Sequence, residues 1–265
     1  MGQFNSSLTR VVPIFDFLKD LDETGGDWLP SLLTMPQGGV VGENNAEFNP
    51  PGELLYTCWG ENEKGLSPPI SLLKWMVQHP FDLNHPENPG NPNPPNNENR
   101  TLLLQGEVDT IADAMQLLDN PNRPNTAWYI LEGISNPDVY LETENLIVVI
   151  EGKRTEPGPT TDTTWMPIRH QMLRHIDCAW ELSDHQHVVG FFIVEGFGGG
   201  EAIDVPDIWG QACNNTVTQL TLEQSLPHRS VEEREEIANA FLGATTWQAI
   251  CMEFGIDWGT LPHQI

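Results

Sequence analysis

The fold is decided by an 18-residue stretch that runs from Asn136 to Lys153 and reads NPDVYLETENLIVVIEGK. Residues 146–150 form an unbroken apolar, largely β-branched run, which is typical of a central strand covered on both faces. The polar residues 142–145 predict a turn, so the segments on either side of it are expected to pair as a hairpin.

Charged side chains follow the apolar run, at Glu151 and Lys153. Because side chains alternate along a strand, these two are expected on one face, with Gly152 between them leaving its backbone open. In the predicted hairpin, Asp138 lies near the end at which Glu151 leaves the strand. Two carboxylates and one ammonium group would then meet where a buried strand reaches solvent.

This combination of side chains suits metal-dependent hydrolysis. Carboxylates are hard oxygen ligands, and Mg²⁺ commonly uses one or two of them while keeping positions open for water and phosphate oxygens. A neighbouring lysine can orient a water or stabilise charge on a phosphoryl oxygen. The simpler interpretation is a solvated strand end. The apolar run before Glu151 and the Pro-Asp pair one strand earlier favour a site.

An apolar stripe with helical spacing predicts a single helix over residues 102–118. Glu107 borders that stripe, so its carboxylate is expected either to reach into a site or to remain in water. Residues 127–132 are interpreted as a strand, and residues 188–194 as a further buried strand.

A second helix is predicted to begin near Pro167 and to run to about residue 182. Arg169 would lie in its first turn on the buried side, where a guanidinium is costly unless it meets a carboxylate or a phosphate. Gln171 and His175 lie four positions apart beside that face.

The chain divides into four segments by composition. Residues 1–83 predict an irregular extension packed on the core, and residues 84–100 an Asn/Pro-rich linker or loop. Residues 101–195 contain the predicted core. Residues 196–265 predict a helical C-terminal extension.

Composition narrows the class of protein. The chain has 265 residues, 38% of them hydrophobic, and nine Trp, which indicates a folded globular protein. Its apolar runs are too short to span a bilayer, and the N-terminus lacks a secretion-signal pattern. The four scattered cysteines form no Cys-x-x-Cys pair, which argues against a zinc ribbon or an iron–sulfur cluster. A cytoplasmic location is therefore expected.

The net charge of −26 is unusual for a protein that meets nucleic acid. Its distribution is uneven, because four of the twelve basic residues fall within 22 positions that begin at the predicted site. These four are Lys153, Arg154, Arg169 and Arg174. The segment around the site is therefore locally positive.

The predicted order of elements between residues 101 and 194 is helix, strand, strand, strand, helix, strand. With Pro137-Asp138 and then Glu151-Gly152-Lys153 closing an apolar strand, this order resembles the PD-(D/E)xK nuclease superfamily. Gln171-Met-Leu-Arg-His175 looks like the Gln-x-x-x-Tyr motif of the RecB-like branch, with His175 at the tyrosine position. The resemblance covers about 95 of the 265 residues.

The resemblance implies an α/β, restriction-endonuclease-like core, in which a mixed central sheet is flanked by helices. It also implies a nuclease that hydrolyses phosphodiester bonds with Mg²⁺ or Mn²⁺ as cofactor. Asp138 and Glu151 would bind the metal, together with the backbone carbonyl of Gly152. Glu107 would supply a further acidic ligand from the first helix.

The resemblance also assigns roles around the metal. Lys153 would position or activate the attacking water, and Gln171 would orient the lysine or a phosphate. To these we add Arg154 and Arg169 as phosphate contacts. The expected partner is nucleic acid, DNA in preference to RNA, with no membrane, and a homodimer is compatible with the sequence.

Two other functions fit parts of the sequence. An interaction protein on the same fold would use its acidic surface to mimic nucleic acid or to bind a basic partner. A small-molecule metallohydrolase would use His185 and His187, whose side chains share a face if they lie on a strand.

Overall fold

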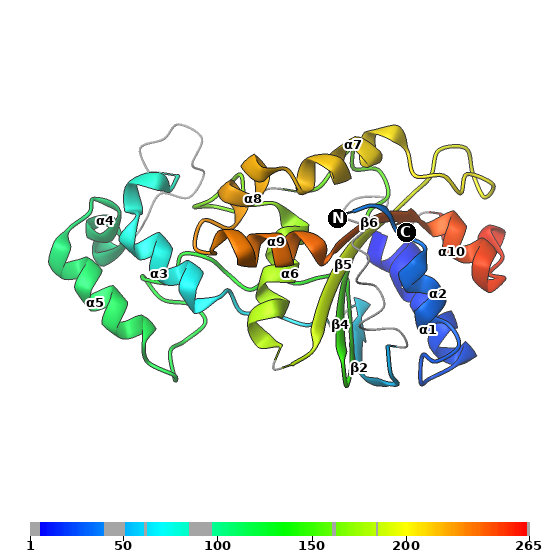
Figure 1. Ribbon diagram of the computed structural model, residues 1–265, viewed down its shortest axis with the longest axis horizontal. Helices are drawn as coiled ribbons and strands as arrows, with labels where there is room; N and C mark the ends of the chain where they lie inside the picture. The colour runs from blue at the N-terminus through cyan, green and yellow to red at the C-terminus, as the bar shows by residue number, and fades with distance from the viewer. Residues whose placement is uncertain are drawn as a thin grey trace.

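The computed structural model of the chain describes residues 6–39, 51–60, 63–84, 97–160, 163–183 and 185–263. These residues form an α/β fold around a six-stranded mixed open sheet with the strand order β1-β6-β5-β4-β3-β2 (Figure 1). The strands are β1 (Gln37–Gly38), β2 (Leu54–Trp59), β3 (Val139–Thr143), β4 (Leu146–Gly152), β5 (His187–Val194) and β6 (Phe241–Thr246).

The predicted hairpin is present as β3 and β4. The two strands are antiparallel, with Val139 opposite Ile150, and every residue of β4 is buried. β4 then runs parallel to β5, and helix α6 (Gln171–Leu182) makes the crossover between them. A strand with neighbours on both sides and helices on both faces reads as a continuous apolar run, as β4 does.

Helices cover both faces of the sheet. Side chains at alternate positions of β4 enter different cores, with Val148 and Ile150 on one side and Ile147 and Val149 on the other. The first core is closed by α1 (Val12–Leu21), α2 (Leu29–Thr34) and α10 (Trp247–Phe254). The second core is closed by α6, α7 (Asp207–Thr216), α8 (Gln219–Ser225) and α9 (Val231–Asn239).

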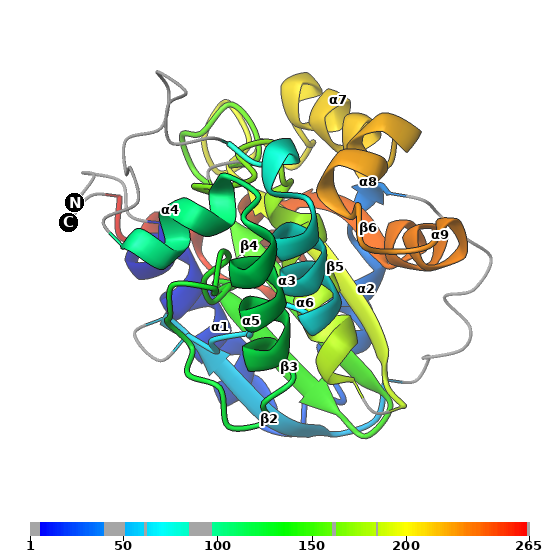
Figure 2. The same ribbon diagram turned by 90° about the vertical axis from the view of Figure 1, so that its left-hand side faces the viewer.

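Three further helices form one end of the molecule around a core of their own. They are α3 (Ile70–Gln78), α4 (Glu98–Leu104) and α5 (Val108–Leu118). Figure 2 looks onto this end and shows α3 and α5 side by side in front of the sheet. Trp165 and Met166, from the segment before α6, complete the same core.

The single helix predicted over residues 102–118 is wrong, because the chain breaks into α4 and α5. Gly106 has a φ of 77°, a left-handed conformation that glycine adopts without strain. Glu107 then begins the new helix as its N-cap. The apolar spacing is continuous across the break, so periodicity alone did not reveal it.

The strand predicted over residues 127–132 is also wrong. This segment forms a turn, and Arg100 donates hydrogen bonds to the carbonyl oxygens of Ala127 and Trp128. The strand that pairs with β3 is instead β2, from the N-terminal segment. The predicted second helix begins at Gln171 rather than near Pro167, so Arg169 precedes it.

The sheet unites segments that the sequence suggested were separate. β2 comes from residues 1–83 and β6 from residues 196–265, so the proposed boundaries of the core cut through one sheet. Most of the predicted linker, residues 85–96, lies outside the described residues. Among the described helices, none combines the length and the apolar character needed to cross a membrane.

Candidate active site

Glu151 and Lys153 mark the end of β4, and their side chains meet. Lys153 Nζ lies 3.1 Å from Glu151 Oε1, and both residues are buried. The backbone of Lys153 is held from two sides. Its N–H donates to Ile193 O in β5 at 2.8 Å, and its carbonyl oxygen accepts from Trp247 Nε1 at 3.1 Å. The lysine is therefore fixed by the strand beside it and by the first residue of α10.

Asp138, the residue immediately before β3, joins the same end of the sheet. Its Oδ2 accepts a hydrogen bond from the N–H of Gly152 at 2.8 Å, across the hairpin. A glycine is needed at position 152, because a Cβ there would lie 2.7 Å from the ring of Trp247. The structure thus brings Asp138, Gly152, Glu151 and Lys153 together at one point.

Helix α6 supplies two further groups, both bonded to Glu151. Gln171 Nε2 donates to Glu151 Oε1 at 2.7 Å, and His175 Nε2 lies 3.1 Å from Glu151 Oε2. The two residues are four apart on the helix and therefore face the same way. Together they contact both oxygens of the Glu151 carboxylate.

His175 is itself held by Ser135, whose Oγ lies 2.7 Å from His175 Nδ1. Because a carboxylate can only accept, His175 Nε2 carries the hydrogen, and in the neutral ring Nδ1 accepts from the serine. Ser135 is fully buried and pairs with Leu66 in an isolated β-bridge. The chain Ser135–His175–Glu151 therefore sets the orientation of the carboxylate from within the core.

Carboxylates outnumber cations at this point. Burial, and then the charge of Glu151, raises the pKa of Asp138 well above its ordinary value. Burial and the same charge raise the pKa of Glu63, which lies in the segment after β2. Burial also opposes ionisation of Glu151, but the hydrogen bond from His175 and the charge of Lys153 bring its pKa below the usual range.

Asp138 and Glu151 are the carboxylates available for the divalent ion that the sequence implies. No group of three or more His, Cys, Asp or Glu residues is arranged to hold a metal within the described ranges. Mg²⁺ needs fewer protein ligands, because it retains several waters and uses one or two carboxylates. The surplus negative charge and oxygen chemistry of Asp138 and Glu151 fit that requirement.

Glu107 does not reach this cluster. Its carboxylate accepts from the N–H groups of Asp109 at 3.3 Å and Thr110 at 2.6 Å, so it caps α5 at the far end of the molecule. The unpaired N–H groups of a first helical turn attract an acceptor. The predicted role of Glu107 as an acidic ligand is therefore corrected to that of a helix cap.

Arg154 and Arg169 are also placed differently from the prediction, because carboxylates already bind both. Arg154 pairs with Glu195 and also donates to Thr9 Oγ1. Arg169 is fully buried between Glu132, at 3.0 Å, and Asp177, at 2.7 Å. Because carboxylates within the described residues already bind both guanidinium groups, these two predicted phosphate contacts are corrected to ion pairs.

His185 and His187 lie at the opposite end of the sheet. His187 begins β5 and is paired in register with Leu146, at the start of β4, whereas Glu151 is near the end of β4. His185 precedes the strand. The structure therefore separates this histidine pair from the carboxylate cluster.

Sequence reasoning placed His175 in a motif but gave it no role, and it missed Ser135 and Glu63. The spacing of Gln171 and His175 on one helix face was the available signal for His175. Ser135 and Glu63 carried no signal, because each reaches the site from an irregular segment whose position depends on tertiary pairing. No family model matches the chain, and no curated protein or solved structure is significantly similar to it.

Proposed function

We propose that the protein is a metal-dependent nuclease that hydrolyses phosphodiester bonds, with DNA as the preferred substrate. The observation that carries this proposal is the meeting of Asp138, Glu151 and Lys153 at the end of one hairpin. A hard divalent cation and a phosphate need the same arrangement: oxygen ligands beside a fixed positive charge.

The order of elements supports the proposal. Helix α1, strands β2, β3 and β4, helix α6 and strand β5 occur in the order that the resemblance to PD-(D/E)xK nucleases implies, with α2 and β1 between α1 and β2. Helix α1 and strand β2 replace the helix and strand first predicted at residues 102–118 and 127–132. The helical end with α3, α4 and α5 is then an insertion between β2 and β3.

Each residue has a task in this proposal. Asp138 and Glu151 would hold Mg²⁺ or Mn²⁺, with the carbonyl oxygen of Gly152 as a further ligand. A bound cation of this kind neutralises phosphoryl charge and lowers the pKa of a coordinated water. Lys153 holds the attacking water beside Glu151. Gln171 keeps Glu151 in the orientation that leaves its remaining lone pairs for the ion.

A serine-nucleophile mechanism is less well supported by the same geometry. Ser135, His175 and Glu151 form a hydrogen-bonded series that resembles a Ser–His–acid arrangement in its contacts. Ser135 is 0% exposed, however, and its hydroxyl points at a ring that faces the core. Its role in the proposal is to position His175.

Cleavage of supercoiled plasmid and of labelled RNA, each with Mg²⁺ or with EDTA, tests the proposal. Wild-type protein should cleave DNA only with the metal. Lys153→Ala and Glu151→Gln should each lower the rate by about 10²–10⁴-fold, the range for a group that transfers or positions a proton. Far-ultraviolet circular dichroism should show that both variants are folded.

Matched controls carry the same charge changes elsewhere. Asp113→Asn on the exposed side of α5 and Lys19→Ala on α1 should leave the rate within about two-fold, since surface charges far from a site act weakly. Undiminished cleavage in Glu151→Gln, or equal losses in the controls, would refute the assignment of the site.

A further inference from the structure

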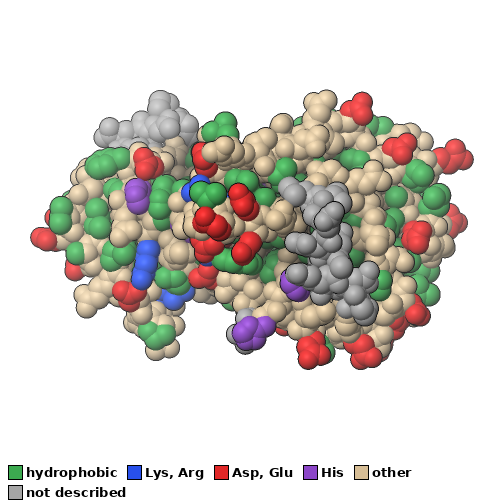
Figure 3. All heavy atoms as spheres, viewed as in Figure 1, with side chains coloured by type: hydrophobic (Ala, Val, Ile, Leu, Met, Phe, Trp, Pro, Cys, Tyr) green, Lys and Arg blue, Asp and Glu red, His purple; other side chains and the backbone are tan. Residues whose placement is uncertain are grey.

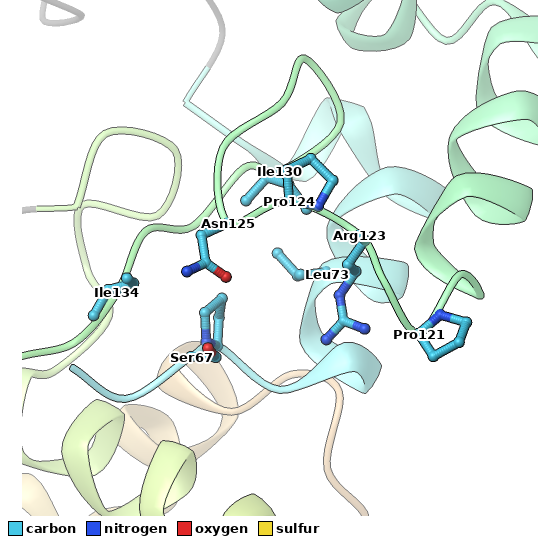
Figure 4. A pocket seen from close by; sticks show the side chains of 9 residues that line it. Ser67, Leu73, Pro121, Arg123, Pro124, Asn125, Ile130 and Ile134 are labelled. Carbon is cyan, nitrogen blue, oxygen red and sulfur yellow. The ribbon is translucent and has the colours of Figure 1, made fainter. Parts of the chain in front are cut away.

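A small pocket lies where the helical end meets the segments that lead to the carboxylate cluster (Figure 4). Its volume is about 160 Å³, well above the roughly 10–15 Å³ needed for one water. Three polar side chains line it, from Ser67, Arg123 and Asn125, together with apolar side chains that include Leu73 and Ile130. The pocket has room for a phosphate group with accompanying water.

Arg123 is the charged group of this pocket. It is half-buried, and within the described residues its guanidinium forms no ion pair with a carboxylate. Most guanidinium groups elsewhere are paired or bound to carbonyl oxygens, and nearby Lys74 is paired with Asp119. On the face drawn in Figure 3, the few basic side chains lie towards the α3–α5 end, whereas acidic ones are spread widely.

Two chain segments connect this pocket to the site. Ile134 lines the pocket, Ser135 contacts His175, and Asp138 belongs to the cluster. Ser67 lines the pocket from the other segment, one residue beyond Leu66, which pairs with Ser135. Four residues of extended chain span at most about 14 Å, so Ile134 lies within that distance of Asp138 along the backbone.

We propose that the Arg123 pocket binds a phosphodiester of the substrate strand, a few nucleotides from the bond that is cleaved. The proposal rests on the proposed nuclease function and extends it to the path of the strand. Consecutive phosphates of one strand are about 3.4 Å apart along a duplex axis, so the distance of at most about 14 Å from Asp138 to the Ile134 wall of the pocket corresponds to about four nucleotides. Arg123 lies across the pocket from that wall (Figure 4). Arg123 offers a planar fork of donors, and the Asn125 amide and Ser67 hydroxyl offer neutral donors.

Binding of short fluorescent single-stranded and duplex DNA, measured by anisotropy in EDTA, tests the pocket without cleavage. Arg123→Ala should raise Kd by about 10-fold and make the dependence of log Kd on log salt shallower by about 0.7–0.9, the contribution of one phosphate contact. Arg123→Lys should recover part of the affinity. Lys19→Ala, an equal loss of charge on exposed α1, should change Kd by less than about two-fold.

Steady-state cleavage separates this proposal from the previous one. If the nuclease proposal holds, Arg123→Ala should raise KM with kcat unchanged, because the contact is the same before and during the reaction. Arg123-dependent DNA binding without any cleavage would support the pocket and reject the nuclease. Normal KM and Kd in a cleaving Arg123→Ala variant would reject the pocket alone.

Competition with inorganic phosphate distinguishes binding of a strand phosphate from binding of a free anion. Inorganic phosphate should compete with DNA only weakly, and removing Arg123 should abolish that competition. If inorganic phosphate protects the wild type against thermal unfolding through Arg123, while DNA affinity is the same in both proteins, the pocket binds a free anion and the strand path is overturned. Unchanged melting of Arg123→Ala without ligand would show that the variant is folded.

Discussion

Helix α6 contributes to two buried ionic clusters whose charges are balanced differently. In one of them, Asp177 is surrounded by Arg169 Nη2 at 2.7 Å, Arg229 Nε at 2.8 Å and His228 Nε2 at 3.3 Å. Burial opposes ionisation of Asp177, but the charge of Arg169 and the contacts of His228 and Arg229 hold its pKa far below the usual range. The negative charge of Asp177 is therefore balanced by cationic side chains of the protein itself.

The cluster around Glu151 has the opposite balance. Lys153 forms its only ion pair with a permanent cation within the described residues, while Asp138 and Glu63 add two carboxylates nearby. Burial is the main cause of the raised pKa values of those two groups, and the charge of Glu151 adds to it. The contrast teaches that burial of charge alone does not mark a functional site. A surplus of one sign, left for a ligand to balance, is the better indicator.

The largest expected effect is a loss of stability on changing the cluster around Asp177. Asp177→Asn leaves Arg169 and Arg229 buried without their shared carboxylate, and should lower the free energy of unfolding by about 3–5 kcal/mol. Urea unfolding followed by tryptophan fluorescence measures it. Glu181→Gln removes a partly exposed partner of Arg229 and should cost less than about 1 kcal/mol. Similar losses of unfolding free energy in both variants would show that Asp177 contributes no more to stability than a partly exposed ion-pair partner.

The next effect concerns His170, which stands between Arg169 of one cluster and Gln171 of the other. Burial, and then the neighbouring His175, lowers the pKa of His170 to about 4. The unfolded chain binds a proton near pH 6.5 and the folded protein does not, so unfolding free energy is lost as pH falls from about 6.5 to about 4. The loss should be about 3 kcal/mol, and it should shrink in His170→Gln.

Urea titrations at a series of pH values check this slope, with His185→Gln as the exposed control. An identical pH dependence in wild type and His170→Gln would contradict the role given to burial.

A smaller effect is expected in the cluster around Glu151, where a substitution should raise the free energy of unfolding instead of lowering it. Asp138→Asn removes one of the crowded charges and retains an acceptor for Gly152 N–H, so it should raise the unfolding free energy by about 1 kcal/mol without metal. Mg²⁺ at roughly thirty times its Kd should stabilise wild type by about 2 kcal/mol and should not stabilise the variant. Calorimetry with and without Mg²⁺ measures both. Equal stabilisation of the two proteins would show that the ion binds elsewhere.

The smallest effect tests the corrected role of Glu107. Glu107→Ala removes the cap of α5 and should lower the unfolding free energy by about 1 kcal/mol. The cleavage rate per folded molecule should be unchanged, because the carboxylate lies outside the cluster. A loss of cleavage beyond ten-fold in the folded variant would restore Glu107 to the site.

Local pattern was enough to predict the β3–β4 hairpin and the neighbourhood of Asp138, Glu151 and Lys153. The apolar run of β4 and its polar turn determine pairing between segments only a few residues apart. The place of β2 could not be predicted in this way, because it pairs with β3 across about 80 residues of intervening chain. Such pairings depend on how whole segments pack, and no short window contains them.

For a buried charged side chain, the sequence predicted that a partner of opposite charge was needed, but not which group it would be. The buried position of Arg169 required an anion, and the sequence could not tell a phosphate from Glu132 and Asp177. Glu107 was placed beside an apolar stripe by periodicity, whereas the break at Gly106 turned it into a cap. The error for Arg169 arose because its partners come from distant parts of the chain, whereas the error for Glu107 arose from a local break in the helix that periodicity did not reveal.

The contact between Trp247 and the backbone of Lys153 joins the end of β4 to a residue 94 positions further along the chain. The indole is both a hydrogen-bond donor to the backbone at the end of β4 and the surface against which Gly152 packs. A nascent polypeptide that has not been translated past residue 247 contains every residue proposed for the chemistry, yet lacks the support that fixes them. A chain cut before residue 247 would therefore leave Gly152 and Lys153 without the contacts that hold the end of β4 in place.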